Sequence, residues 1–304
     1  MNILITGGAG FIGSHLAEHF HGRAAVRVLD SFRTGFRRNL EGMPVDLIEG
    51  DILDRTALRA AMQGVDYVFH LAAMVSVPES VGQPLECERL NGTGTLQVLE
   101  EAAAAGVKKV FFAGSAAVYG DNPAVPKVES MLPEPRSPYA ITKLLGEHYC
   151  RFFHDEGRVP TACLRFFNVF GPRQDPQGPY AAAVPIFIEK ALRNAPLTIF
   201  GDGTQTRDFV YVKDIIAAMV HVTLTPGLTG VFNAGYGEMM TVNELAQKVI
   251  ALAGSTSIVQ HLPERPGDVK HSRAAIDKLL NTGFRHTSSM EDGLRATLDY
   301  FRRT

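Results

Sequence analysis

The sequence has few cysteines, with three in 304 residues. Cys87, Cys150 and Cys163 lie far apart and form no C-x-x-C pair. A disulfide framework or a zinc knuckle needs closely spaced cysteines, so neither is expected, and no metal site is predicted. This use of cysteine favours a reducing compartment, and we expect the protein to be cytoplasmic.

Long apolar runs and blocks of like charge are also missing. No stretch of about 18 uninterrupted apolar residues occurs, as a transmembrane helix would need, and the opening residues MNILIT lack a cationic leader segment. Lys and Arg number 30 against 32 Asp and Glu, a net charge of −2. We therefore expect no membrane insertion, no secretion and no nucleic-acid partner.

Short apolar runs alternate with longer amphipathic stretches, in a chain with room for about two domains. This alternation predicts a doubly wound α/β fold of the Rossmann type, with a parallel sheet covered on both faces. The predicted strands are residues 3–5, 26–29, 45–48, 67–70, 110–113 and 161–166.

The pattern weakens at residues 171–179, which are rich in Gly and Pro, and it returns near 209–211. We predict a first domain of residues 1–170 plus about 206–236, whose last strand lies near 231–233. The remaining segments, about 171–205 plus 237–304, form a smaller discontinuous C-terminal lobe.

A glycine-rich segment, TGGAGFIG at 6–13, lies between a predicted strand and a predicted helix. Gly7 would permit the tight turn, Gly10 the approach of a pyrophosphate, and Gly13 close packing of the helix on the sheet. The alternative is an ordinary glycine turn. The position between strand and helix favours a dinucleotide site.

Asp30 ends the second predicted strand, about 20 residues after the glycines, where a carboxylate can accept both hydroxyls of an adenosine ribose. It would repel a 2′-phosphate, which favours NAD over NADP, although Arg33 nearby leaves NADP open. Asp30 could instead cap a loop or helix. Asp51, followed by Ile52, could contact the adenine amino group or cap the next helix.

Tyr139 and Lys143 lie four residues apart in a predicted helix, and Ser115 ends a predicted strand. This spacing places the phenol and the ammonium on one helical face. A tyrosine acts as a base near neutral pH only if cations favour the phenolate, as Lys143 and an oxidised nicotinamide would. A solvent-exposed helix face is the alternative for a Tyr and Lys pair taken alone.

Several motifs together resemble the extended short-chain dehydrogenase/reductase superfamily and, within it, the UDP-hexose 4-epimerases. The superfamily motifs are TGGAGFIG at 6–13, HLAA at 70–73, GSAAVYG at 114–120 and YAITK at 139–143. The epimerase motifs are RFFNVFGPRQDP at 165–176, GDGTQTRDFVYVKD at 201–214 and RPGD at 265–268.

The resemblance implies an NAD-binding first domain, a UDP-sugar-binding lobe and a site between them. It makes Tyr139 the catalytic base, Lys143 its supporting cation and Ser115 its hydroxyl partner. The implied NAD contacts are Gly7, Gly10, Phe11, Ile12, Gly13, Asp30, Asp51, Ile52, Leu71, Ala72, Ala73, Tyr139 and Lys143. The implied substrate contacts are Ser76, Ser115, Tyr139, Asn168, Ala182, Val184, Arg207, Arg265, Asp268 and Ser272.

Within this set, Asn168 is similar to the family's pyrophosphate-binding asparagine, and Arg207 and Arg265 to its phosphate-facing arginines. Surface ion pairing is the alternative for the arginines. Asp268 is similar to a ligand of the uridine ribose.

Ala116 and Ala117 follow Ser115, where related dehydratases and decarboxylases usually carry acidic residues. The absence of acidic residues at these two positions favours epimerisation at one carbon.

Ser272, seven residues after Arg265, stands where family members restricted to glucose and galactose often have Tyr, and Ala182 is another small residue. Both favour N-acetylated sugars. Val75 departs from a glycine in that group, so an exclusive preference is not expected.

The predicted function is interconversion of UDP-N-acetylglucosamine and UDP-N-acetylgalactosamine, and of UDP-glucose and UDP-galactose, through a 4-keto sugar with NAD remaining bound. Alternatives are an epimerase restricted to unacetylated sugars, a net oxidoreductase or dehydratase, and a non-catalytic NAD-sensing module. The resemblance also implies a homodimer, formed by helices at about 83–105 and 137–155.

Overall fold

A computed structural model describes residues 1–177, 181–264 and 270–303. The chain folds into two units. Unit 1 consists of residues 1–120, 132–166 and 216–232, and unit 2 of residues 121–131, 167–215 and 233–304.

Unit 1 is built on a seven-stranded sheet in the order β11-β6-β5-β4-β1-β2-β3. All strand pairings from β3 across to β6 are parallel. The predicted doubly wound fold is therefore confirmed, and all six predicted strands and the last strand near 231–233 form. The strands are β1 (Asn2–Thr6), β2 (Ala25–Asp30), β3 (Val45–Glu49), β4 (Tyr67–His70), β5 (Lys109–Ser115), β6 (Thr161–Phe166) and β11 (Gly230–Ala234).

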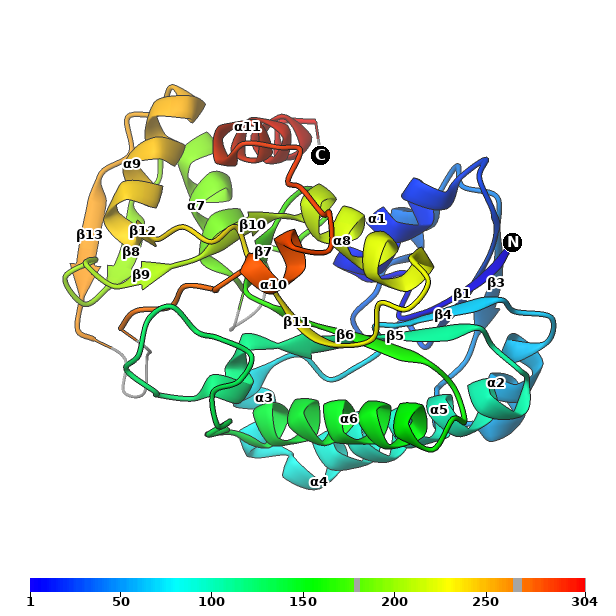
Figure 1. The fold of residues 1–304 in the computed structure, drawn as a ribbon. Coiled ribbons are helices and arrows are strands. Elements are labelled where there is room, and N and C mark those ends of the chain that lie inside the picture. The colour runs from blue at the N-terminus through cyan, green and yellow to red at the C-terminus, as the bar shows by residue number, and fades with distance from the viewer. Residues whose placement is uncertain (178–180, 265–269, 304) are drawn as a thin grey trace. The chain divides into compact units, whose positions relative to one another are not determined.

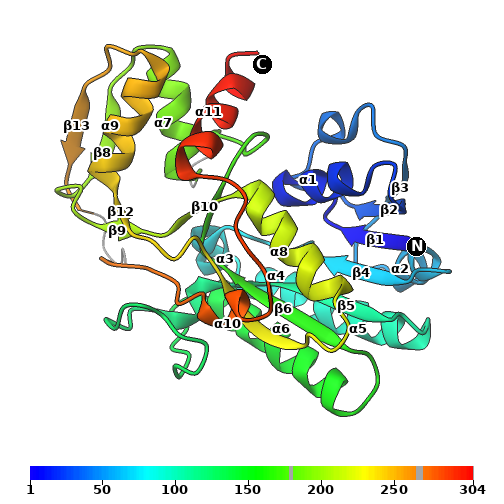
Figure 2. The same ribbon diagram turned by 45° about the horizontal axis from the view of Figure 1, so that its top comes forward.

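Helices cover both faces of this sheet (Figure 1, Figure 2). One face carries α1 (Phe11–Phe20) and residues 216–224 of α8 (Val212–Leu224). The other carries α2 (Arg55–Met62), α3 (Val77–Gly82), α4 (Pro84–Cys87), α5 (Gly94–Ala104) and α6 (Pro138–Asp155). Apolar side chains between the sheet and the second group of helices form a buried core that includes Leu4, Val68, Val98, Val110 and Phe153. Short 3-10 turns occur at Arg37–Leu40 and Ala116–Tyr119.

The helix expected at about 83–105 is not one regular α-helix. A π-helical segment, Glu88–Thr93, separates α4 from α5. The helix expected at 137–155 forms as α6, which Pro138 begins and Ser137 caps by accepting the Ala140 amide.

The alternative role of Asp51 as a helix cap is wrong. Asp54 caps α2 by accepting the amides of Thr56 and Ala57. The Asp51 carboxylate instead accepts the Leu53 amide at 2.9 Å, which closes a local turn.

The described residues of unit 2 form three short strand pairs and the helices α7 (Ala183–Leu192), α9 (Val242–Ala253), α10 (Asp277–Leu280) and α11 (Met290–Phe301). β7 (Asn168–Phe170) is parallel to β10 (Phe209–Tyr211), and β8 (Leu197–Phe200) is parallel to β13 (Val259–Leu262). β9 (Thr206–Arg207) is antiparallel to β12 (Met240–Thr241).

Four segments expected in the first domain group with unit 2: residues 121–131, 167–170, 206–215 and 233–236. The Lys127 amide donates to Arg273 O, and Lys127 O accepts the Ala275 amide, each at 2.8 Å. Residues 209–211 pair with β7. Because these backbone hydrogen bonds join residues far apart in the sequence, local hydrophobic periodicity gives no sign of them.

Candidate active site

The turn between β1 and α1 has three glycines in different surroundings. Gly7 has a φ of +73°, and a Cβ there would lie 2.7 Å from the Ala72 amide nitrogen. A Cβ on Gly13 would lie 2.3 Å from Gly7 O. A Cβ on Gly10 would have only Gly7 O, at 3.3 Å, within 4 Å. Gly7 and Gly13 are therefore required by packing within the protein, whereas Gly10 borders open space.

The surroundings of this turn fit NAD. α1 begins at Phe11 with no hydrogen bond from a side-chain cap and no acidic residue in its first turn, so its positive end can receive a phosphate. Asp30 is buried, and its two carboxylate oxygens accept the amides of Ala9 and Phe32, each at 2.8 Å. Burial raises the pKa of Asp30, and the two backbone hydrogen bonds oppose that rise. Each oxygen keeps a lone pair for a ribose hydroxyl.

The other predicted NAD contacts in this unit follow neighbouring strands. Ile52 is buried in the core and packs at the start of α5, where a Cβ on Gly94 would lie 2.6 Å from its Cδ1. Residues 71–73 are half-buried and follow β4 directly. These segments follow the carboxyl ends of parallel strands, the sheet edge where ligands of such folds bind.

Lys143 lies on α6 and is buried, at 4% exposed. Its Nζ donates to Ala113 O at 2.8 Å and lies 5.8 Å from the centre of the Tyr139 ring. Burial lowers the pKa of Lys143 to about 8. The lysine thus remains largely cationic at neutral pH while its ammonium is fixed in place.

Ser115 ends β5, and its hydroxyl accepts the Ala117 amide at 3.2 Å. Burial raises the pKa of Tyr139, and a hydrogen bond with Ser115 opposes that rise. The protein alone therefore keeps the phenol neutral. A phenolate at neutral pH needs a further positive charge, such as that of an oxidised nicotinamide.

Two buried polar residues that the sequence analysis missed hold this arrangement. The Ser80 hydroxyl accepts the Tyr139 amide at 3.1 Å. Asn91, on the π-helical segment, accepts the Met74 amide at 2.7 Å and donates to Met74 O and to Thr142 Oγ1. Asn91 therefore joins the segment after β4 to α6. π-helical turns are frequent at functional sites, but the sequence does not reveal this turn.

His70, the first residue of the HLAA motif, is buried between two hydroxyl groups. Its Nδ1 lies 2.8 Å from Thr6 Oγ1 and its Nε2 lies 3.0 Å from Thr95 Oγ1. Burial, with a further contribution from Lys143, lowers the pKa of His70 to about 3. The imidazole is therefore neutral and adds no second cation beside Lys143.

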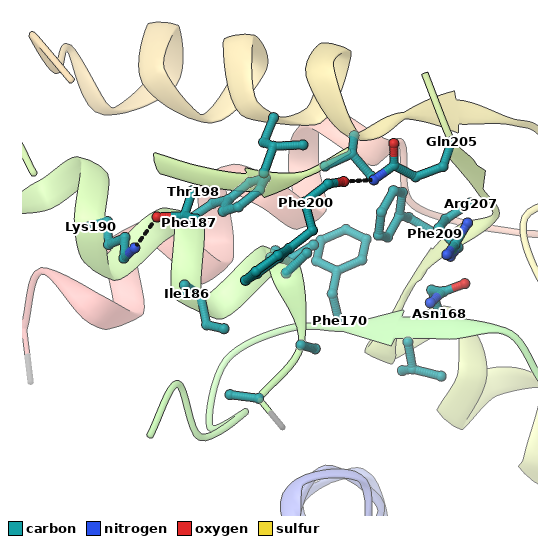
Figure 3. Close-up of a pocket in the computed structure, with 17 residues that line it drawn as sticks. Asn168, Phe170, Ile186, Phe187, Lys190, Thr198, Phe200, Gln205, Arg207 and Phe209 are labelled. Carbon is teal, nitrogen blue, oxygen red and sulfur yellow. Dashed lines mark hydrogen bonds between the residues drawn. The ribbon is translucent and has the colours of Figure 1, made fainter. Parts of the chain in front are cut away.

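In unit 2, one cavity of about 490 Å³ brings four predicted substrate residues together: Asn168, Ala182, Val184 and Arg207. Figure 3 shows Asn168 and Arg207 side by side at one end of this cavity. An amide and a guanidinium can together bind a phosphate. The aromatic rings of Phe170, Phe187, Phe200 and Phe209 line the rest.

The remaining predicted substrate residues lie elsewhere. Ser272 is half-buried and does not line the cavity, although its amide donates to Thr206 O at 3.2 Å, beside Arg207. Ser76 belongs to unit 1, where it caps α3 by accepting the Glu79 amide. Arg265 and Asp268 lie outside the described residues.

Asp208 organises the backbone around Arg207, a role that the motif at 201–214 does not indicate. It is completely buried, and its carboxylate accepts the amides of Tyr236, Gly237 and Ala274 at 2.6–3.0 Å. Its carbonyl oxygen accepts the Asn168 amide at 3.0 Å. Asp208 therefore links the strand of Arg207 to Asn168 and to the segment of Ser272.

Asp208→Asn should change how stability depends on pH. Burial raises the pKa of Asp208 from 3.8 to about 6, and the three amide bonds oppose that rise. Between those values the folded state holds a proton that the unfolded state has released. Protonation therefore stabilises the folded wild type as pH falls from about 6 to about 4, by on the order of 1 kcal/mol per pH unit. The asparagine variant lacks this effect.

Denaturant unfolding at pH 7 and pH 5 measures the effect as the unfolding free energy of the wild type minus that of the variant. The difference should be larger at pH 5, because other titrating groups cancel in the subtraction. An unchanged difference would contradict the raised pKa of Asp208.

Across residues 1–177, 181–264 and 270–303, no helix is long and apolar enough to cross a membrane. Within the same ranges, no group of three or more His, Cys, Asp or Glu residues could hold a metal ion.

Comparison with known proteins agrees with this geometry. The family model "NAD dependent epimerase/dehydratase family" matches residues 3–235. UDP-N-acetylglucosamine 4-epimerase from Methanobrevibacter ruminantium, solved with UDP-N-acetylmuramic acid, is 39% identical with a TM-score of 0.95, covering 99% of this chain and 98% of that one. UDP-glucose 4-epimerase from Thermus thermophilus, solved with NAD, is 37% identical with a TM-score of 0.92, covering 99% of each chain.

A relative with a different activity is about as similar. UDP-N-acetyl-alpha-D-glucosaminuronate decarboxylase from Bacillus cytotoxicus is 35% identical over 316 residues, covering 98% of this chain and 97% of its own. The resemblance that the motifs indicated is confirmed. The chain is an enzyme of the NAD dependent epimerase/dehydratase family, with NAD as its cofactor, and within that family it resembles the UDP-hexose 4-epimerases.

Proposed function

We propose that the protein is a UDP-sugar 4-epimerase that interconverts UDP-N-acetylglucosamine and UDP-N-acetylgalactosamine, and also UDP-glucose and UDP-galactose. The observation that carries this proposal is the group formed by Ser115, Tyr139 and Lys143, followed by two alanines. Ala116 and Ala117 begin the 3-10 turn after Ser115 and provide no acid for a second proton transfer. We therefore assign proton transfer to one sugar hydroxyl.

When bound, NAD supplies the reversible oxidation of the sugar at C4. Tyr139, as phenolate, takes the O4 proton directly or through Ser115 and later returns it. Lys143 would hold the ribose of the nicotinamide, and its charge favours the phenolate. The ammonium can do both because its bond to Ala113 O leaves two N–H groups.

Asn168 and Arg207 anchor the pyrophosphate in this proposal, with Arg265 as a second cation and Asp268 on the uridine ribose. Anchoring through the nucleotide leaves the sugar free to turn over as a 4-keto intermediate. Reduction from the opposite face then inverts C4 with no net oxidation.

Acceptance of acetylated sugars rests on small residues. Ser272 and Ala182 would leave room for a substituent at C2, whereas the exposed Val75 stands where some UDP-N-acetylglucosamine 4-epimerases carry a glycine. The two epimerase relatives named above are assigned to UDP-N-acetylglucosamine and UDP-glucose respectively. Both observations support activity on both pairs.

The direct test is to incubate the purified protein with each of the four UDP-sugars, without added NAD, and to resolve the products by chromatography. Each sugar should give its C4 epimer, with no accumulation of NADH. Loss of carbon dioxide or water from the sugar, or stoichiometric NADH, would instead favour a decarboxylase, dehydratase or dehydrogenase.

We also propose that the protein is a homodimer. Large apolar side chains are exposed on α3, α4 and α6 of unit 1, among them Leu85 at 86% and Phe152 at 52%. Light scattering at micromolar concentration should give about twice the chain mass of 33.1 kDa. Leu85→Glu should shift the mass toward the monomer, because a charge at an apolar interface would lose its hydration. A wild-type mass of one chain would contradict the dimer.

A further inference from the structure

The cavity of unit 2 is polar at its two ends and apolar between them. Figure 3 shows Asn168 and Arg207 at one end, Lys190 and Thr198 at the other, and Phe200 between. Its volume of about 490 Å³ suits a small organic ligand. The cationic Arg207 end suits phosphate, and the aromatic middle suits a flat ring. This layout matches a nucleotide whose base points toward Lys190.

The Lys190 end presents hydrogen-bond donors to the cavity. Lys190 lies in the last turn of α7, and its Nζ donates to Thr198 Oγ1 on β8 at 3.0 Å. The ammonium keeps two further N–H groups, and the Thr198 hydroxyl, having accepted this bond, keeps its own hydrogen. The hydroxyl also has a second lone pair and can accept a further bond, but the ammonium only donates. A ligand atom that bonds to Lys190 Nζ must therefore be an acceptor.

The shape of a pyrimidine decides which atom reaches this end. The sugar is attached at N1, and C4 lies directly across the ring from N1. With the phosphates at Arg207, the substituent on C4 is the part of the base nearest Lys190. In uracil this substituent is a carbonyl oxygen, which only accepts hydrogen bonds. In cytosine it is an amino group, which donates and would face the ammonium with like polarity.

We propose that Lys190 is a specificity-determining residue that selects a uracil nucleotide over a cytosine nucleotide by donating a hydrogen bond to the 4-keto oxygen. This inference rests on the proposed function, because it takes the nucleotide of the substrate as the occupant of the cavity. It assigns the choice of base to one side chain outside the catalytic group.

A neighbouring cation just after the same helix provides a matched control. Arg193 follows α7 and is 71% exposed at its side chain, where it pairs with Glu189 at 2.9 Å. It does not line the cavity. Arg193→Met therefore removes one positive charge near Lys190 without changing the polar end of the cavity.

The experiment is isothermal titration of UDP and CDP into the full-length wild type, Lys190→Met, Lys190→Gln and Arg193→Met. The wild type and Arg193→Met should bind UDP at least about tenfold more tightly than CDP, as one charge-assisted hydrogen bond allows. Lys190→Met should lose about tenfold in UDP affinity and little in CDP affinity, so that the two nucleotides bind almost equally. Lys190→Gln keeps a neutral donor and should retain part of the preference.

Thermal unfolding of each variant confirms that the protein remains folded. If Lys190→Met keeps the wild-type ratio of UDP to CDP affinity, the role of Lys190 is overturned and the proposed function stands. An equal loss for both nucleotides also overturns it, since that would reflect general electrostatics or packing. If the wild type binds neither nucleotide, the Lys190 assignment and the proposed function are both overturned.

Discussion

Tyr139→Phe should lower epimerase turnover by at least about three orders of magnitude, because the group that takes and returns the O4 proton is removed. The ring remains, and so does the Tyr139 amide bond to Ser80, so the start of α6 should keep its position. Turnover is measured by chromatography of the UDP-sugar products under saturating substrate.

The control for this variant is its cofactor content. NAD released by denaturing the protein should match the wild-type amount, since the glycine turn and Asp30 are unchanged. Full NAD content with near-normal turnover would overturn Tyr139 as the base. Loss of NAD would locate the defect in cofactor binding instead.

Ser272→Tyr should abolish turnover of the N-acetylated sugars while that of UDP-glucose and UDP-galactose stays within about tenfold, or about 1.4 kcal/mol in the barrier. If Ser272 borders the substituent on C2, the phenol ring would fill the space that an acetamido group needs. The Ser272 amide donates to Thr206 O beside Arg207, which fixes the backbone from which the ring would project.

The quantity to measure is the ratio of kcat/KM between acetylated and unacetylated sugars. Ser272→Ala is the matched control, because it removes the hydroxyl without adding volume and should leave the ratio close to that of the wild type. An equal fall for both sugar classes in Ser272→Tyr would remove the main support for N-acetylhexosamine substrates and favour a UDP-glucose 4-epimerase.

Several features of the fold could be predicted from local patterns. Strands such as β1 and β5 are buried on both faces, so they read as continuous apolar runs, and all predicted strands form. The turn at 6–13 could also be predicted, because the positive φ of Gly7 and the close packing of Gly13 leave no room for another residue.

Other features depend on contacts between residues distant in the sequence. The periodicity of residues 83–105 indicates a helix but not the π-helical segment that places Asn91 against Met74 and Thr142. Likewise, Asp208 accepts three backbone amides from residues 236–274, and the residues next to Asp208 in the sequence do not indicate these hydrogen bonds.

The sequence by itself determined the Rossmann-type sheet, the family and the motif residues, because alternating apolar runs, glycine turns and the spacing of Tyr139 and Lys143 are local properties of the chain. Only the tertiary structure decided which segments join unit 2, that burial raises the pKa of Tyr139 and lowers that of Lys143, and that Lys190 meets Thr198 at the end of a cavity. The physical reason is that burial, electrostatic environment and hydrogen-bond partners depend on neighbours in space, which the order of residues along the chain does not specify.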